Sequence, residues 1–135
     1  MDFVLDASVA LAWCFPDEST EYATNVLRRF TEQQAVVPAI WPLEVSNALI
    51  AGNRRGRIGR EQIETAVKLL QALDITVDEL QLSRTFHATI PLALSHILSA
   101  YDAAYIELAQ RMCCPLATSD RKLRQAAETA GIEIL

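Results

Sequence analysis

The sequence predicts a three-layer α/β/α domain, in which helices flank a short parallel sheet of four to five strands. Two observations lead to this prediction. Short apolar segments alternate with longer segments of helical periodicity, and strands joined by helices are typical of a parallel sheet covered on both faces. The length of 135 residues suits one domain, spanning 1–135, with a substantial core.

The composition and the net charge indicate a folded globular protein without a generally basic surface. Hydrophobic residues make up 51% of the chain and charged residues 21%, which is the balance of a folded globular protein. The formal net charge of −5 gives no general attraction for nucleic acid, so RNA binding would require a local basic patch. The three cysteines lack metal-ligand spacing and are expected as reduced thiols, which favours a cytoplasmic protein. We expect no secretory signal and no membrane association, because no apolar run approaches the ~20 residues of a spanning helix.

The chain is expected to begin with one strand and two helices. Residues 3–5 form a short apolar run that ends on Asp6, which places Asp6 at the carboxyl end of a strand. Residues 7–15 are apolar nearly all round, as in a buried helix. A second helix is expected from Asp17 to about Gln34, because its apolar positions recur at helical spacing.

A second strand and a third helix follow. The apolar segment 35–38 is the expected strand, and the helix covers 40–50, where Pro42 is tolerated in the first turn. Glu44 lies in this helix among apolar neighbours, and a carboxylate on so apolar a helix requires a reason. Residues 52–60 are expected to form an arginine-rich loop.

The middle of the chain is expected to hold two helices around a third strand. An amphipathic helix at 61–73 leads to the strand at 75–77. The segment 82–98 has helical character but contains Pro91. Proline has no amide hydrogen to donate, so we expect it to split this helix.

The C-terminal part is expected to complete the sheet. A helix at 99–109 has Ser99 as a favourable N-cap. A short buried strand follows at 115–117, then a helix at 120–130 and a last strand at 132–135. The order of strands and helices gives no sign of an internal repeat or of a linker between domains.

Four carboxylates from distant parts of this chain are expected at one edge of the sheet. Asp6 and Asp120 follow strands, and the carboxyl ends of parallel strands share one edge. Glu44 and Asp102 lie in the first turns of helices that start at that edge. Four unpaired acids would repel one another, and a hard divalent cation such as Mg²⁺ or Mn²⁺ would relieve the repulsion. Such an ion supports phosphodiester hydrolysis by activating water and stabilising charge at phosphorus.

Each acid also has a simpler interpretation. Asp6, Asp102 and Asp120 stand where helices begin, so each of them could serve only to cap its helix. Glu44 could be a surface acid whose stem lies along apolar neighbours. The expected placement of all four at one edge is what favours a shared site.

Four segments carry a resemblance to a known family: Val4-Leu-Asp-Ala-Ser8, Pro42-Leu-Glu-Val-Ser-Asn-Ala-Leu49, Leu98-Ser-Ala-Tyr-Asp-Ala-Ala-Tyr105 and Leu116-Ala-Thr-Ser-Asp-Arg-Lys-Leu123. They resemble the four acidic motifs of the PIN-domain family, in the same order. The likeness is greatest to VapC-type toxins of prokaryotic toxin–antitoxin systems. It runs nearly end to end, and the segments around Asp102 and Asp120 are the most specific.

The resemblance implies a PIN-like fold and a metal-dependent endoribonuclease that hydrolyses RNA phosphodiester bonds with Mg²⁺ or Mn²⁺. On this pattern the catalytic and metal-binding carboxylates are those of Asp6, Glu44, Asp102 and Asp120. The side chains that match supporting positions near the cluster are Ser8, Thr118 and Ser119. The resemblance also implies a homodimer that is neutralised by a small, VapB-like antitoxin protein.

Basic side chains are the candidates for contact with RNA phosphates. They are Arg54, Arg55, Arg57, Arg60, Arg121 and Lys122. The alternative for the first four is an ordinary solvated loop, and the alternative for the last two is favourable charge on the surface of a helix.

Two other functional classes remain as alternatives. A phosphoacceptor domain also places acids at strand ends, but it should carry an acid pair after its first strand and a lysine after a later one. Here Asp2 lies at the other end of the first strand, and the later strand ends on Thr118-Ser119-Asp120. A non-catalytic regulatory module would not need four intact acids, so the nuclease hypothesis is preferred to both.

Overall fold

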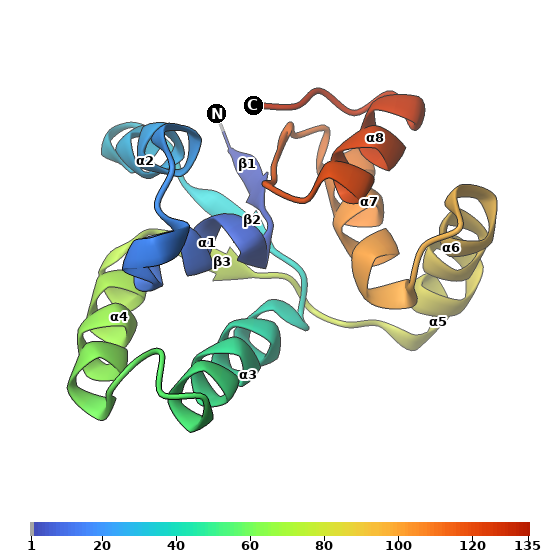
Figure 1. Cartoon of the computed structure of the whole chain (residues 1–135). Coiled ribbons are helices and arrows are strands. Elements are labelled where there is room, and N and C mark those ends of the chain that lie inside the picture. The colour runs from blue at the N-terminus through green and yellow to red at the C-terminus, as the bar shows by residue number, and fades with distance from the viewer. Residues whose placement is uncertain (1) are drawn as a thin grey trace.

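A computed structural model describes residues 2–135 and shows a four-stranded parallel sheet between helices (Figure 1). The strand order is β3-β2-β1-β4, and all three strand pairs are parallel. The strands are β1 (Phe3–Leu5), β2 (Ala35–Val37), β3 (Ile75–Val77) and β4 (Leu116–Ala117). The predicted three-layer α/β/α fold with a short parallel sheet is therefore confirmed.

The helices gather in two groups around the sheet. The main helices are α1 (Ala7–Cys14), α2 (Glu21–Arg28), α3 (Trp41–Arg54), α4 (Arg60–Ala72), α5 (Leu82–Arg84), α6 (Ile90–His96), α7 (Ala100–Met112) and α8 (Arg121–Thr129). In Figure 1, α1 to α4 lie on the left and α5 to α8 on the right, and both chain ends lie at the top. Helix α1 packs against α2, α3 and α4, whereas α7 packs against β1 and β4.

The central strand β1 fixes where the candidate site forms. Its three apolar side chains are fully buried, as expected for a parallel strand covered on both faces. Val4 pairs with Val36 on one side and with Leu116 on the other. Because these strands run in the same direction, the residues that follow β1, β2 and β4 all emerge at one edge of the sheet.

Two predicted boundaries in the first half of the chain are wrong. The helix expected from 17 to 34 is three pieces, the 3₁₀ turns η1 (Pro16–Glu18) and η2 (Arg29–Thr31) with α2 between them. A new helix starts because the Thr20 side chain accepts a hydrogen bond from the Ala23 amide. The loop expected at 52–60 is shorter at both ends, since α3 continues through Arg54 and α4 begins at Arg60.

The structure also departs from the prediction in the second half of the chain. Pro91 does not split the segment 82–98 as predicted: the chain stays helical from α5 through the π-helical stretch η3 (Thr85–Thr89) into α6, and Pro91 lies in the first turn of α6, where its missing amide is tolerated. The strand expected at 132–135 forms only one parallel bridge, between Leu116 and Ile134. No helix within residues 2–135 is both long enough and apolar enough to span a membrane.

Candidate active site

Asp6 is the innermost of the four predicted carboxylates. It follows β1 and precedes α1, and only 7% of its surface is exposed. Its Oδ2 accepts hydrogen bonds from the Ser8 hydroxyl at 2.6 Å and the Thr118 hydroxyl at 2.7 Å. Although Asp6 occupies the N-cap position of α1, its side chain makes no capping hydrogen bond. The simple capping interpretation is therefore wrong for this residue.

The two hydroxyls that donate to Asp6 are themselves oriented by backbone amides. The Ser119 amide donates to the Ser8 hydroxyl oxygen, and the Asp120 amide donates to that of Thr118, both at 3.0 Å. A hydroxyl that accepts an amide proton directs its own proton elsewhere, and here that proton points to Asp6. The structure thus brings all three predicted supporting residues, Ser8, Thr118 and Ser119, together beside Asp6.

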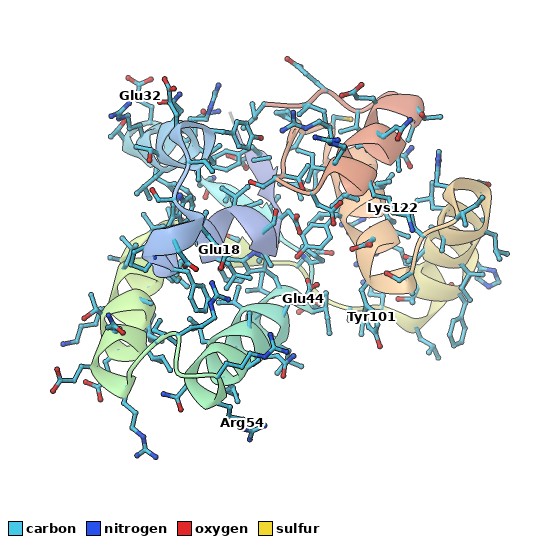
Figure 2. The ribbon with its side chains drawn as sticks, viewed as in Figure 1. Glu18, Glu32, Glu44, Arg54, Tyr101 and Lys122 are labelled. Atoms are coloured by element: carbon cyan, nitrogen blue, oxygen red, sulfur yellow. The ribbon has the colours of Figure 1, made fainter. Side chains whose placement is uncertain are left out.

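Glu44 reaches the same edge from α3 and is held by a tyrosine. It lies in the first turn of α3, half-buried, and Figure 2 shows it on the side of that helix toward α7. Its Oε1 accepts a hydrogen bond of 2.6 Å from the hydroxyl of Tyr105, a residue of α7 with no exposed surface. The Tyr105 oxygen in turn accepts the Ala7 amide at 3.4 Å.

Sequence reasoning gave Tyr105 no functional role. The signal available was its spacing, because Tyr105 follows Asp102 by three residues and residues three apart lie on one face of a helix. The spacing does not reveal that the hydrogen-bond partner of Tyr105 is Glu44 on α3, because that contact depends on how two distant helices pack.

Asp102 and Asp120 complete the group and have different local roles. Asp102 lies partly buried in the first turn of α7, where the Ser99 side chain caps the helix by accepting the Asp102 amide at 3.1 Å. Asp120 is exposed and caps α8, since its Oδ1 accepts the Leu123 amide at 3.1 Å. Capping is thus confirmed for Asp120, whereas the Asp102 carboxylate is not needed for the cap that Ser99 provides.

Burial and the charges of neighbouring acids raise the pKa values of three of these carboxylates, those of Asp6, Glu44 and Asp102. Burial raises the pKa of Asp6, the charges of Asp120 and Asp102 raise it further, and the two hydroxyl donors oppose the rise. Burial also raises the pKa of Glu44, and the charges of Asp6 and Asp102 add to the effect against the Tyr105 hydrogen bond. The pKa of Asp102 is raised by burial and then by Asp120, while Lys122 lowers it.

The chemistry of these donors fits a hard divalent cation. All four are carboxylates, and repulsion among them is the condition that a cation would relieve. Within the described part of the chain, no group of three or more His, Cys, Asp or Glu side chains is arranged to hold a metal ion in this structure. Mg²⁺ commonly keeps several waters and takes one or two protein carboxylates, so the group suits an ion that retains part of its hydration shell.

Comparison with known proteins shows the family. The sequence profile of the PIN domain matches residues 3–129, which is nearly the whole chain. The chain belongs to the PIN domain family. This PIN domain is 29% identical over 125 residues to Ribonuclease VapC3 of Pyrobaculum aerophilum, a match that covers 93% of this chain and 94% of that protein.

Solved structures agree with the family assignment at the level of the fold. PAE2754 from Pyrobaculum aerophilum superimposes with a TM-score of 0.70 at 20% identity, over 96% of this chain and 91% of that one. The structure of VapBC2 from Rickettsia felis, bound to a DNA fragment from their promoter, superimposes with a TM-score of 0.70 at 11% identity. The match covers 100% of this chain and 98% of that one. FitAcB from Neisseria gonorrhoeae superimposes with a TM-score of 0.64 at 14% identity, over 100% of this chain and 96% of that one.

The six candidate RNA-binding side chains of this PIN domain fall into two places. Arg121 and Lys122 are exposed at the start of α8, directly after Asp120. Arg54 lies at the other end of α3 from Glu44, about 15 Å along the helix axis (Figure 2). The remaining three, Arg55, Arg57 and Arg60, are exposed at or near the connection between α3 and α4.

Arg57 already has partners in the protein. Its guanidinium pairs with the carboxylates of Asp17 at 2.9 Å and Glu18 at 3.1 Å, and lies over the Phe15 ring at 4.6 Å. These contacts fasten the connection after α3 to the turn after α1. The structure therefore places two basic residues beside the carboxylates and four away from them, one of which is engaged in ion pairs.

Proposed function

We propose that this PIN domain is a VapC-type endoribonuclease that hydrolyses RNA phosphodiester bonds with Mg²⁺ or Mn²⁺. The observation that carries the proposal is a pair of hydrogen-bond links at one edge of the sheet: the Thr118 hydroxyl joins the Asp6 carboxylate to the Asp120 amide, and the Tyr105 hydroxyl joins the Glu44 carboxylate to the Ala7 amide. The charges of Asp102 and Asp120 also contribute to the raised pKa of Asp6. A ribonuclease relative that matches almost the full length of both chains supports the same activity.

The protein side chains prepare the site in distinct ways. Ser8 and Thr118 hold Asp6 through Oδ2, while its Oδ1 has no hydrogen-bond partner among residues 2–135 and remains available as a ligand. Glu44 and Asp102 are partly buried with raised pKa values, which suits such carboxylates to accept a proton from an attacking water. When bound, the cation supplies Lewis-acid stabilisation of charge on the phosphate oxygens.

The basic residues beside the cluster suit the RNA backbone. Arg121 and Lys122 are exposed next to Asp120, where the start of α8 also offers a partial positive charge to an anion. Because an acidic cluster alone repels RNA, cations at its border are needed to hold the phosphates on each side of the scissile bond. In this proposal the arginines between α3 and α4 contact only a longer RNA.

A protein partner is part of the proposal. The structural likeness to VapBC2 supports a small antitoxin partner of the VapB type, and we propose a cytoplasmic homodimer as the unit that it neutralises. Large apolar side chains that are exposed on and near α5 and α6 would suit protein contact; they include Leu80, Leu82, Phe86, Leu94 and Ile97. Light scattering of the purified protein should give twice the mass of one chain, and the mass of a single chain would contradict the dimer.

The proposed activity is tested by RNA cleavage with purified protein. We expect cleavage in millimolar Mg²⁺ or Mn²⁺, loss of cleavage in EDTA, and a rate lowered by about 10²–10⁴-fold in Asp102→Asn. Glu61→Gln is the matched control, because it removes an exposed carboxylate on α4 outside the cluster. Cleavage that continues at the wild-type rate in EDTA would contradict the metal-dependent mechanism.

A further inference from the structure

The hydroxyl of Tyr105 joins two parts of the candidate site. It donates to Glu44 Oε1 at 2.6 Å and accepts the Ala7 amide at 3.4 Å. We propose that Tyr105 is a positioning residue that holds the Glu44 carboxylate at the edge of the cluster and fixes it relative to the start of α1. This inference rests on the proposed metal-dependent function and adds a residue to it.

At the start of α1, the Tyr105 hydroxyl accepts a backbone amide. The first amides of a helix lack partners within the helix, and an Asp at the N-cap position ordinarily accepts the second or third of them, here those of Ser8 or Val9. At this helix the Ala7 amide is directed to Tyr105, and the Asp6 side chain makes no cap bond. Tyr105 therefore accepts the first amide of α1, which an N-cap side chain does not reach, while the Asp6 carboxylate accepts the Ser8 and Thr118 hydroxyls.

In the hydrogen bond to Glu44, the Tyr105 hydroxyl is the donor. A phenolic hydroxyl has one proton, and the Tyr105 oxygen already accepts the Ala7 amide, so its proton is the one shared with Glu44. The O···O distance of 2.6 Å is in the range of a hydroxyl bound to an ionised carboxylate. The Tyr105 ring is fully buried, so the hydroxyl has one fixed position.

Without the Tyr105 hydroxyl, nothing in the described part of the chain would hold the Glu44 carboxylate toward the cluster. Glu44 has a long side chain on the first turn of α3, and the charges of Asp6 and Asp102 both act against its ionised form. Tyr105 is its one side-chain hydrogen-bond partner within residues 2–135. Repulsion and rotamer freedom would therefore turn an unheld Glu44 toward solvent, and displacement of a reacting or ligating group by about 1 Å is costly.

The test is a double-mutant cycle read out as Mn²⁺ affinity, measured by calorimetry without RNA. Tyr105→Phe retains the buried ring and removes only the hydroxyl, and we expect it to weaken Mn²⁺ binding about tenfold, as is typical when a partner of a metal ligand is lost. In a Glu44→Gln background the same change should alter the affinity less than about twofold, because its partner carboxylate is already absent. Tyr101→Phe, on an exposed tyrosine of the same helix, is the control and should leave the affinity unchanged.

The outcomes separate this inference from the proposed function. Equal losses with and without Glu44, or no loss from Tyr105→Phe, would overturn the positioning role. A wild-type protein that binds Mn²⁺ and shows the expected cycle, but cleaves no RNA, contradicts the proposed activity alone. A wild type that binds no Mn²⁺ overturns both.

A measurement on the wild-type protein covers the case in which Tyr105→Phe does not fold. A crystal structure with Mn²⁺ bound should retain the hydrogen bond between Tyr105 and Glu44 while Glu44 faces the cation. Separation of the two side chains in that structure would overturn the inference.

Discussion

Asp6 and Asp120 both follow strands at the same edge of the sheet, yet their side chains do different things. Asp120 caps α8, whereas Asp6 accepts two hydroxyls and caps nothing. Both positions have the same sequence pattern, a carboxylate between a strand and a helix. The difference depends on Ser8 and Thr118, which come from two segments that meet only in the folded chain.

The pKa shifts give a prediction at this scale. The folded-state pKa of Asp102 is raised by burial and by Asp120. An acid of this kind binds more protons in the folded state, so its contribution to stability is full below its unfolded pKa and is lost as the pH rises through the folded pKa. Asp102→Asn should therefore raise the melting temperature in EDTA at pH 7, and the gain should shrink toward pH 3.

Asp120→Ala is the matched comparison, because it removes a carboxylate that does cap a helix. Loss of the Asp120 capping hydrogen bond should lower the free energy of unfolding by about 0.5–2 kcal/mol. Thermal melting and urea unfolding check both expectations: Asp102→Asn should be more stable than wild type in EDTA at pH 7, and Asp120→Ala should be less stable. An Asp102→Asn variant that melts below wild type at pH 7 would show that this carboxylate also serves as a structural cap.

At the scale of elements, periodicity predicted where strands and helices exist better than where they end. The four strands lie where apolar runs placed them, because short buried strands leave a clear signal. The break before α2 was missed because the Thr20 cap, which starts a new helix, lies inside a segment with continuous helical spacing. The end of α3 was missed because Ala51 to Asn53 contain a glycine that is typical of loops.

That glycine, Gly52, gives a prediction about packing. A Cβ at this position would lie 2.7 Å from Cε1 and 2.8 Å from Cζ of Phe15, a buried ring with the Arg57 guanidinium over it. Relief of such crowding costs about 1–3 kcal/mol, while alanine gains only about 1 kcal/mol over glycine inside a helix. Gly52→Ala should therefore destabilise the protein in urea unfolding, and by less in a Phe15→Leu background. A stabilised Gly52→Ala variant would show that the ring moves freely.

The start of α8 gives a prediction about RNA. Replacement of Arg121 and Lys122 by serine should weaken RNA binding and reduce the slope of log affinity against log salt by about 1–2, because each phosphate contact of single-stranded RNA contributes about 0.7. The matched control is the same change at Arg54 and Arg55, which lie away from the carboxylates at the end of α3. Binding of a short RNA, measured at several salt concentrations, checks this, and an equal effect of both pairs would contradict a local role for α8.

In the molecule as a whole, the placement of Asp6 and Asp120 at one edge of the sheet could be predicted, because both follow parallel strands. Carboxyl ends of parallel strands must share an edge, and the strand order β3-β2-β1-β4 places β1 beside both β2 and β4. The hydrogen-bond network inside that edge could not be predicted. The link from Tyr105 to Glu44 requires the relative placement of α3 and α7, which share no local sequence signal.

Metal-dependent thermal melting of the substrate-free protein tests the proposal that Asp6, Glu44, Asp102 and Asp120 share a cation-binding site. A cation that binds only the folded state raises the melting temperature by mass action. Millimolar Mg²⁺ or Mn²⁺ should therefore raise the melting temperature of wild type and of Glu61→Gln, and should raise that of Asp102→Asn much less. An equal rise in all three proteins, or no rise in wild type, would contradict the proposal.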